Sequence, residues 1–405
     1  MIGRVSVACL RLAVVTAAVL LAGCATVPDR AFVPQALVTL AQPPGLDRVR
    51  IWGDDPQSDF KPFLAAEAPV IRRNYLNRER KGVPLEASML ALSGGADDGA
   101  FGAGFMVGWS DRGQRPQFDL VTGVSAGALI APFAYLGPAY DSQLREVFTR
   151  YSGDNIYQAN VLSGLLGGAG IADSDPLKEL IAKYVNRSLM RRISAQRAQG
   201  RVLLIGTTNI DAQRPVYWDL GRIAQADTPQ ALDMMRKVLL ASASIPGVFP
   251  PVRIAVTANG KSYEELHVDG GTTREVFFSP ADFSFAALDQ AIGVPLKRKL
   301  YVIRNGKIGF EWEATEESAL KIGQRSLSTV LKNQALGDLT RMYQKAQTEN
   351  IDYNLASIPN GFSAPHPHPF DQAYMQSLFK TGRDLGASRN PWLKKPPSFM
   401  VESRK

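Results

Sequence analysis

The chain has 405 residues, of which 45% are hydrophobic, and a formal net charge of +8. That length and hydrophobic content are ample for a large buried core. The lysines and arginines are scattered and do not form basic patches interleaved with aromatic residues, so the mild positive charge does not indicate a nucleic-acid-binding protein.

The N-terminus predicts a lipoprotein signal peptide over residues 1–23. Two arginines lead into an apolar run at 12–21, which is too short for a membrane span and fits a signal-peptide core. The next residues, Leu21-Ala22-Gly23-Cys24, resemble a bacterial lipobox, which is cleaved before its cysteine. We expect Cys24 to carry diacylglycerol and to anchor the protein to a membrane. Because Ala25 is not the aspartate that commonly retains lipoproteins in the inner membrane, the outer membrane is favoured.

Residues 24–84 are rich in proline and polar residues and are predicted to be a tether and lead-in, with one helix within 65–81. The other cysteine of the chain, Cys9, lies inside the predicted signal, so the mature protein would have no disulfide. Its stability must then come from the core.

Residues 85–390 are predicted to form one three-layer α/β domain, because short apolar runs alternate with helical patterns. The predicted strands are at 89–92, 119–122, 201–206, 266–269 and 299–304. Leucines at helical spacing predict a long helix over 316–348 that packs on the sheet. Residues 391–405 are proline-rich and basic and are predicted to be an extended tail.

The first chemical motif is the glycine-rich loop at 93–99, with the sequence SGGADDG. It follows a predicted strand and precedes a predicted helix at 100–109, and its glycines can bring bare N–H groups close to a ligand oxygen. A dinucleotide-binding loop is disfavoured, because Val107 stands where that motif requires its last glycine. The adjacent Asp97 and Asp98 are more typical of a solvated turn than of a cation site.

The second motif is Gly123-Val124-Ser125-Ala126-Gly127, about thirty residues further on. It lies between a predicted strand and the alanine-rich helical pattern of residues 126–136, so Ser125 is placed at a tight strand-to-helix turn with its hydroxyl exposed. A serine becomes nucleophilic when a base takes its proton and N–H groups stabilise the oxyanion that forms. The two motifs together therefore predict a serine hydrolase.

A loop at 160–172 combines several leucines, isoleucine and valine with glycines. It is predicted either to line an acyl-chain entrance or lid near Ser125 or to be a buried glycine-rich connection, and the sequence favours neither.

Candidate bases for the serine come from 266–271, with the sequence LHVDGG. This short strand delivers Asp269 onto a glycine turn, and His267 lies on the same strand face. His267 is more simply interpreted as a hydrogen-bonded residue beside the site. The remaining histidines, His366 and His368, lie in a proline-stiffened loop and are poor candidates for catalysis.

These motifs resemble the patatin-like phospholipase family, which uses a Ser-Asp dyad instead of a histidine triad. Residues 93–99 match its oxyanion loop, 123–127 its nucleophile motif and 269–271 its Asp-Gly-Gly motif. A fourth block, residues 241–252, resembles the segment that packs a proline-rich turn near the dyad. The blocks occur in the family's order, and the resemblance implies an α/β/α fold with a mostly parallel sheet.

The resemblance implies that Ser125 is the nucleophile, Asp269 its activating partner, and the N–H groups of Gly94, Gly95 and Ala96 the oxyanion donors. It implies neither a metal nor an organic cofactor. Two positions depart from the family pattern. The third glycine of the loop is Ala96, and the usual basic residue is Asp98, which would shift preference toward neutral esters.

The sequence therefore predicts a lipid acyl hydrolase that acts on membrane lipids or lipid-derived esters. One alternative is a carboxylesterase with a Ser-His-Asp triad, which would need an essential histidine. Another is a catalytically silent, lipid-binding envelope lipoprotein. The sequence specifies neither the head group, the chain length nor the oligomeric state.

Overall fold

The computed structural model describes residues 30–54, 61–80, 82, 85–153, 156, 158–159 and 172–399. The predicted signal peptide, Cys24 and all of the 160–172 loop except Ala172 lie outside these residues. Among the described helices, none has the length and apolar character needed to span a membrane.

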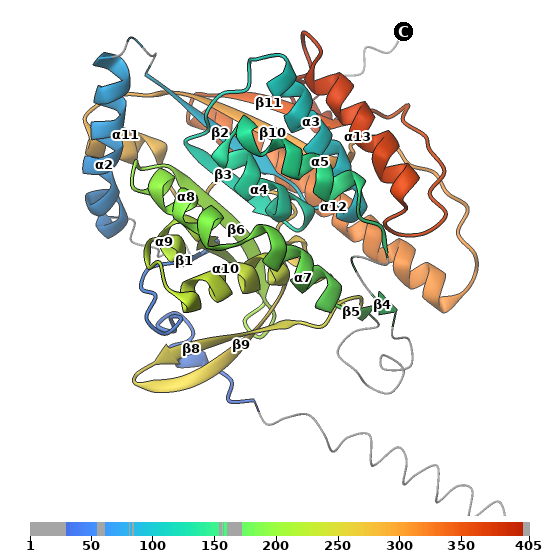
Figure 1. Cartoon of the computed structure of the whole chain (residues 1–405), viewed down its shortest axis with the longest axis horizontal. Coiled ribbons are helices and arrows are strands. Elements are labelled where there is room, and N and C mark those ends of the chain that lie inside the picture. The colour runs from blue at the N-terminus through green and yellow to red at the C-terminus, as the bar shows by residue number, and fades with distance from the viewer. Residues whose placement is uncertain are drawn as a thin grey trace, which may run out of the picture.

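A mixed sheet forms the centre of the fold, with strand order β1-β7-β6-β3-β2-β10-β11 and a β8-β9 hairpin joined through β9 to β6 (Figure 1). The strands from β6 to β11 in that order are parallel, whereas β1, β7 and the hairpin are antiparallel additions. The strands are β1 (Arg50–Trp52), β2 (Glu86–Leu92), β3 (Leu120–Val124), β6 (Val202–Asn209), β7 (Arg214–Asp219), β8 (Val252–Ala258), β9 (Lys261–Asp269), β10 (Lys297–Lys307) and β11 (Ile351–Ile358). A separate short pair joins β4 (Gln158–Ala159) and β5 (Ala172–Asp173).

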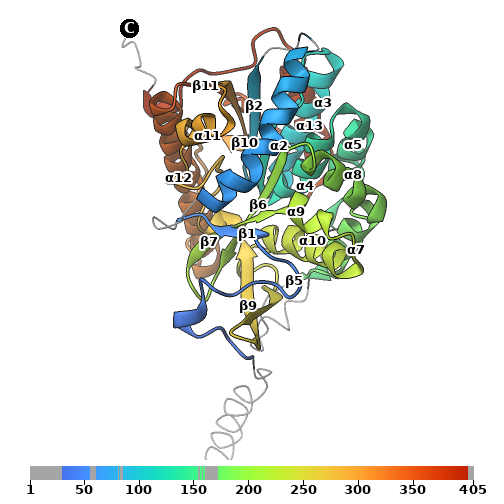
Figure 2. The same ribbon diagram turned by 90° about the vertical axis from the view of Figure 1, so that its left-hand side faces the viewer.

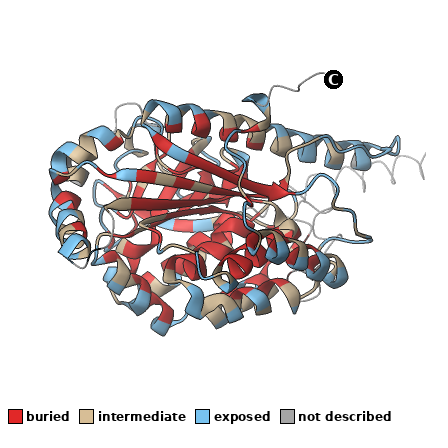
Figure 3. Ribbon diagram, turned by 90° about the horizontal axis from the view of Figure 1, so that it is seen from above, coloured by how far each residue is buried: buried red, intermediate tan, exposed pale blue. Residues whose placement is uncertain are grey.

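Helices cover both faces of the sheet, so the predicted three-layer α/β/α architecture is confirmed (Figure 3). One face carries α3, α4, α10 and α13, with α5 and α7–α9 around them, and the other carries α11 and α12, with α2 at one end (Figure 2). The helices are α2 (Lys61–Arg80), α3 (Gly99–Asp111), α4 (Ala126–Leu136), α5 (Asp141–Thr149), α7 (Asp175–Tyr184), α8 (Arg187–Arg197), α9 (Leu220–Gln225), α10 (Pro229–Ser242), α11 (Phe285–Ile292), α12 (Ala319–Thr348) and α13 (Gln372–Gly386).

Strand β2 shows why the central runs are continuously apolar. Leu90 and Leu92 enter the core cluster on the α3–α4 face, whereas Met89 and Ala91 enter the cluster on the α12 face. Successive side chains of a strand point to opposite faces, so a strand covered on both sides must be apolar at every position. All five strands predicted from sequence are present in the structure.

The ends of the described chain pack against the domain. Within the predicted lead-in, β1 pairs with β7, and Trp52 belongs to the main core. Within the predicted tail, the Trp392 ring lies 5.0 Å from Phe105 and 4.9 Å from Trp109, measured between ring centroids. Both segments therefore add buried aromatic surface to the domain.

The long helix predicted over 316–348 is confirmed as α12, but only its C-terminal half packs on the sheet. Ala335, Leu339 and Met342 are buried, whereas Leu327 and Val330 are 42% and 59% exposed. The leucine stripe was expected to be buried along its whole length, and this expectation is wrong. The physical reason is that the helix runs on past the edge of the sheet (Figure 1).

Candidate active site

The two glycine motifs lie at one edge of the sheet because they follow neighbouring parallel strands. β2 and β3 are paired in parallel, with Leu92 opposite Gly123. The loop that follows β2 and the turn that follows β3 therefore leave the sheet side by side. The carboxyl ends of parallel strands are a common position for the active sites of open α/β sheets.

Ser125 lies on a strained turn between β3 and α4. Its φ is +52°, in the left-handed region that non-glycine residues rarely occupy, and it is only 6% exposed. A Cβ on Gly123 would lie 2.5 Å from the Gly127 carbonyl oxygen, and one on Gly127 would lie 2.4 Å from that of Leu92. The two flanking glycines are therefore required by close backbone packing around the serine.

Asp269 is brought to Ser125 by the way in which two strands share β6. Strand β3 pairs with β6 as far as Val124 opposite Gly206, and β9 pairs with β6 from the next position, Asp269 opposite Thr207. The ends of β3 and β9 therefore lie at neighbouring positions along β6. Ser125 and Asp269, far apart in the sequence, meet where these two strands end.

The Asp269 carboxyl is buried, and only one of its oxygens has a hydrogen bond. Oδ1 accepts the Gly271 N–H at 2.7 Å, whereas Oδ2 has no hydrogen bond of normal geometry to any described residue. Burial raises the pKa of Asp269 to about 7, and the negative charge of Glu275 adds to the rise, while the nearby Ser125 hydroxyl and the Gly271 N–H oppose it. A carboxylate with such a pKa accepts a proton far more readily than an exposed aspartate.

If Asp269 is the base of a serine hydrolase, as the sequence predicts, hydrolytic activity should increase with pH through about 7, because the carboxyl must be ionised to accept a proton. The kcat/KM for a neutral ester, measured from pH 5 to 9, should fall about tenfold per pH unit on the acid side. A neutral ester is used so that the substrate itself does not titrate. A profile that is flat down to pH 5 would exclude Asp269 as the base with this pKa.

The segment at 242–244 makes a backbone-directed hydrogen bond to each of Ser125 and Asp269. The Ser242 hydroxyl accepts the Ser125 N–H at 3.0 Å and donates to the Gly206 carbonyl at 2.6 Å. Two residues later, the Ser244 carbonyl accepts the Asp269 N–H at 2.9 Å. The block at 241–252 was expected near the dyad, but sequence reasoning did not assign these roles to its serines.

The glycine loop offers two of its three predicted oxyanion donors. The Gly94 N–H donates to the Glu275 carbonyl at 3.0 Å, whereas the N–H groups of Gly95 and Ala96 donate to no acceptor within the described residues. Ala96, with φ +49°, lines the same small cavity as Ser125. Gly95 and Ala96 are therefore the donors available to a substrate oxygen.

The family model for patatin-like phospholipases matches residues 90–282, a range that contains both Ser125 and Asp269. This region of the chain is therefore patatin-like. No curated protein matches the chain in sequence.

Two solved structures resemble the chain that contains this patatin-like domain. VipD from Legionella pneumophila is 13% identical, with coverage of 75% of this chain and 66% of that one and a TM-score of 0.31. Human GIVD cytosolic phospholipase A2 is 10% identical, with coverage of 82% of this chain and 56% of that one and a TM-score of 0.30. The chain thus spans less than two thirds of either structure's length, and the family assignment rests on the sequence match.

An arginine from outside the motifs supports the glycine loop of this patatin-like domain. Arg304 Nη1, from β10, donates to the Gly94 carbonyl at 3.0 Å and to Ser93 Oγ at 3.1 Å, and lies 3.4 Å from a carboxylate oxygen of Glu275. The loop position usually occupied by a basic residue is Asp98, so Arg304 supplies a positive charge beside the loop from another strand. The sequence motifs contained no signal for it.

The two aspartates of the loop do not form a solvated turn. Asp97 Oδ2 accepts the Phe370 N–H at 2.8 Å and lies 2.7 Å from His366 Nε2, while Asp98 accepts the Tyr374 hydroxyl. Burial raises the pKa of Asp98 to about 6, although Tyr374 opposes this rise. The aspartates thus join the loop to the 366–374 segment, and no metal-binding cluster of His, Cys, Asp or Glu occurs among the described residues.

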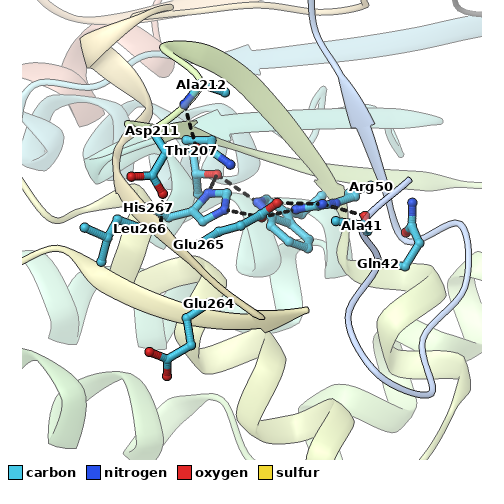
Figure 4. Close-up of polar contacts among 12 residues, drawn as sticks. Ala41, Gln42, Arg50, Thr207, Asp211, Ala212, Glu264, Glu265, Leu266 and His267 are labelled. Carbon is cyan, nitrogen blue, oxygen red and sulfur yellow. Dashed lines mark hydrogen bonds and ion pairs between the residues drawn. The ribbon is translucent and has the colours of Figure 1, made fainter. Parts of the chain in front are cut away.

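His267 belongs to a buried structural network of the patatin-like domain (Figure 4). Its Nδ1 lies 2.9 Å from Thr207 Oγ1 and its Nε2 lies 3.1 Å from Glu265, which also forms an ion pair with Arg50. Burial lowers the pKa of His267, so the ring is neutral at physiological pH. Both ring nitrogens are engaged away from Ser125, as the simpler interpretation of this histidine predicted.

Two hollows of different character flank the glycine loop. A cavity of about 50 Å³ beside Ser125 has apolar walls that include Leu129, Phe148, Leu177 and Phe249. Across the loop, a cleft of about 570 Å³ is lined by Gly95 and Asp98 together with the charged residues Glu275, Arg304, Lys307, Glu311, Arg325 and Lys332. The site thus separates an apolar compartment from one that also carries charged side chains.

Proposed function

We propose that the protein is a lipid acyl hydrolase of the phospholipase A or esterase type, in which Ser125 and Asp269 form a catalytic dyad. The observation that carries the proposal is the buried Asp269 oxygen without a hydrogen bond, beside a serine on a strained strand-to-helix turn. The family match supports hydrolysis of lipid esters.

In this mechanism Asp269 removes the proton from the Ser125 hydroxyl as Ser125 Oγ bonds to the ester carbonyl carbon. The N–H groups of Gly95 and Ala96 stabilise the resulting oxyanion. As the intermediate collapses, the ester C–O bond breaks and Asp269 returns the proton to the departing alcohol. Asp269 then takes a proton from water, which attacks the acyl-enzyme, and Ser125 regains its proton when the fatty acid leaves.

The two hollows support a lipid substrate. The apolar cavity beside Ser125 suits the beginning of an acyl chain, while the cleft across the loop suits the polar part of the molecule. Arg304 lines this cleft, which favours acceptance of a polar head group despite the acidic Asp98.

The alternatives have less support. A Ser-His-Asp triad would require a histidine with a free ring nitrogen, whereas both nitrogens of His267 are already engaged. A silent binding protein would not need an intact serine turn with a proton-accepting carboxylate beside it. We further propose that Cys24 is lipidated and anchors the protein in the cell envelope, with the outer membrane favoured.

An exposed apolar surface beside the cleft suggests that the substrate is presented in a lipid surface. We define the apolar arm as the loop 308–318 and the N-terminal half of α12. In it, Phe310 is 85% and Trp312 is 77% exposed, and Ile322, Leu327 and Val330 are also exposed. Phe310 lines the same cleft as Gly95. Aromatic side chains are favoured at membrane interfaces, so the arm is suited to hold a lipid surface next to the site.

Replacing Phe310 and Trp312 together by serine is expected to lower the rate on phospholipid vesicles about tenfold or more, because two large apolar contacts with the lipid are lost. The rate on a monomeric short-chain ester should stay within twofold, since neither residue touches Ser125. Phe32→Ser removes another exposed aromatic residue and is the matched control. Equal losses on both substrates would contradict the role of the arm.

The test of the proposed function is the hydrolysis of a short-chain nitrophenyl ester and of phosphatidylcholine vesicles by the purified protein. Wild type should release fatty acid from both, Ser125→Ala from neither, and His267→Gln should retain activity if it folds. Thermal unfolding of each variant separates loss of catalysis from loss of fold. Hydrolysis of the nitrophenyl ester without hydrolysis of the vesicles would show a simple esterase. Activity in Ser125→Ala would overturn the proposed mechanism.

A further inference from the structure

A third hollow, separate from the two beside the glycine loop, lies on the α11–α12 face of the sheet, away from the Ser125 site. Its volume is about 300 Å³, it is open on one side, and its walls come from the sheet, α2 and α11. None of the predicted catalytic or oxyanion residues lines it. Ligand sites are typically concave and mostly apolar, and a pocket of this size and lining has the character of one.

The walls of the cavity are mainly apolar. They include Met89, Leu204, Phe278, Leu288 and Leu296. A cavity of about half this volume accommodates a benzene ring in a well-studied protein, so this one has room for on the order of ten to twelve carbon atoms. The volume and the lining therefore fit a single unbranched acyl chain.

Among the described residues, one cation of the pocket lining has no partner. Arg298 pairs with Asp289, Asp119 pairs with Arg78 at 2.9 Å, and the other charged residues of the lining are likewise paired. Arg48, in contrast, is exposed and makes no ion pair or hydrogen bond within the described part of the chain. Its guanidinium is available to a carboxylate at the mouth of the cavity.

Ser279 is one of the residues that line the pocket. Its hydroxyl is buried and has no hydrogen-bond partner among the described residues. A buried hydroxyl without a hydrogen-bond partner lowers the free energy of unfolding. Nothing in the described structure explains a serine at this position. Enlarging this side chain would reduce the cavity without breaking any hydrogen bond.

We propose that this cavity binds one free fatty acid of about ten to twelve carbon atoms, with its carboxylate on Arg48 and its chain between the sheet and α11. Such a fatty acid is also a product of the proposed hydrolysis, but binding at this cavity does not depend on Ser125. The cavity would hold a fatty acid even in a catalytically inactive chain.

The test is binding of dodecanoate, labelled with ¹³C at its carboxyl carbon, to the full-length Ser125→Ala protein. Calorimetry should give a saturable site, and the labelled carbon should show a distinct bound signal. In that background, Ser279→Leu should weaken binding at least tenfold by filling the cavity, whereas Ser279→Ala should bind as the parent does. Arg48→Gln should weaken binding about tenfold and shift the bound signal, and Arg48→Lys should largely preserve binding.

Dodecylphosphocholine distinguishes a fatty acid from a lipid with a zwitterionic head. It has the same chain without the carboxylate and should bind at least tenfold more weakly than dodecanoate. Dodecanoate binding that is unchanged by both Ser279→Leu and Arg48→Gln would place the ligand elsewhere and overturn the proposal, as would absence of binding. Thermal unfolding of Ser279→Leu checks its fold, and ester hydrolysis by the same variant in a chain with an intact Ser125 should remain at wild-type level.

Discussion

Replacing Asp269 by asparagine is expected to lower kcat by about 10²–10⁴-fold, the usual contribution of a general base. Asparagine keeps the oxygen that accepts the Gly271 N–H, so the turn after β9 should remain in place. What is lost is the ability to accept the Ser125 proton. The measurement is steady-state hydrolysis of a neutral ester at pH 8, where wild-type Asp269 is mostly ionised.

The same substitution should stabilise the fold at alkaline pH. The pKa of Asp269 is raised to about 7 in the folded protein, so its protonated form contributes stability that is complete below about pH 4 and is lost as the pH rises through 7. An asparagine side chain cannot ionise, and Asp269→Asn should therefore gain about 2–4 kcal/mol over wild type at pH 8 and almost nothing at pH 4. In the ester hydrolysis assay at pH 8, equal activity of Asp269→Asn and wild type would show that Asp269 is not the base.

Gly127→Ala is expected to disrupt both the serine turn and the fold. The new Cβ would lie 2.4 Å from the Leu92 carbonyl oxygen and 2.6 Å from that of Ser93, and both are backbone atoms that cannot rotate away. We expect the free energy of unfolding to fall by about 2–4 kcal/mol and kcat/KM to fall at least 100-fold. Denaturant unfolding and ester hydrolysis provide the two measurements.

Gly323→Ala is the matched control. Gly323 lies in the exposed half of α12, and a Cβ there would meet no atom within 4 Å. Alanine should raise the free energy of unfolding by about 0.5–1 kcal/mol, because it is the better helix former, and leave hydrolysis unchanged. If the Gly127 variant behaved like this control, close packing at the serine turn would not be needed for activity.

The sheet and the positions of Ser125 and Asp269 could be predicted because local patterns encode them. Strands covered on both faces require apolar runs such as Met89 to Leu92, and a tight turn requires small neighbours such as Gly123 and Gly127. The carboxyl ends of parallel strands then bring the following loops together. The short strand ending at Asp269 carried a comparable signal, since a glycine pair follows it.

The supporting residues could not be predicted, because their roles come from contacts between distant segments. Ser242 accepts the Ser125 N–H from the end of α10, and Arg304 reaches the glycine loop from β10. The carbonyl that occupies the Gly94 N–H belongs to Glu275. None of these contacts follows from the spacing of residues within a motif.

The exposure of the N-terminal half of α12 could not be predicted, for a different reason. Leu327 and Leu331 continue the helical stripe that Ala335 and Leu339 begin, so the periodicity predicts one buried face throughout. Periodicity shows which residues share a face but not where the sheet beneath that face ends. The half of the helix beyond the sheet forms part of the apolar arm.

The most direct test of the central claim is to identify the residue modified by an alkyl fluorophosphonate, which phosphonylates an activated serine. Mass spectrometry of the intact protein and of its peptides should find one label, on Ser125, in wild type. His267→Gln should be labelled at the same serine, Asp269→Asn should react at least 100-fold more slowly, and Ser125→Ala should not react. A label on another serine, or labelling of Asp269→Asn at the wild-type rate, would contradict a dyad formed by Ser125 and Asp269.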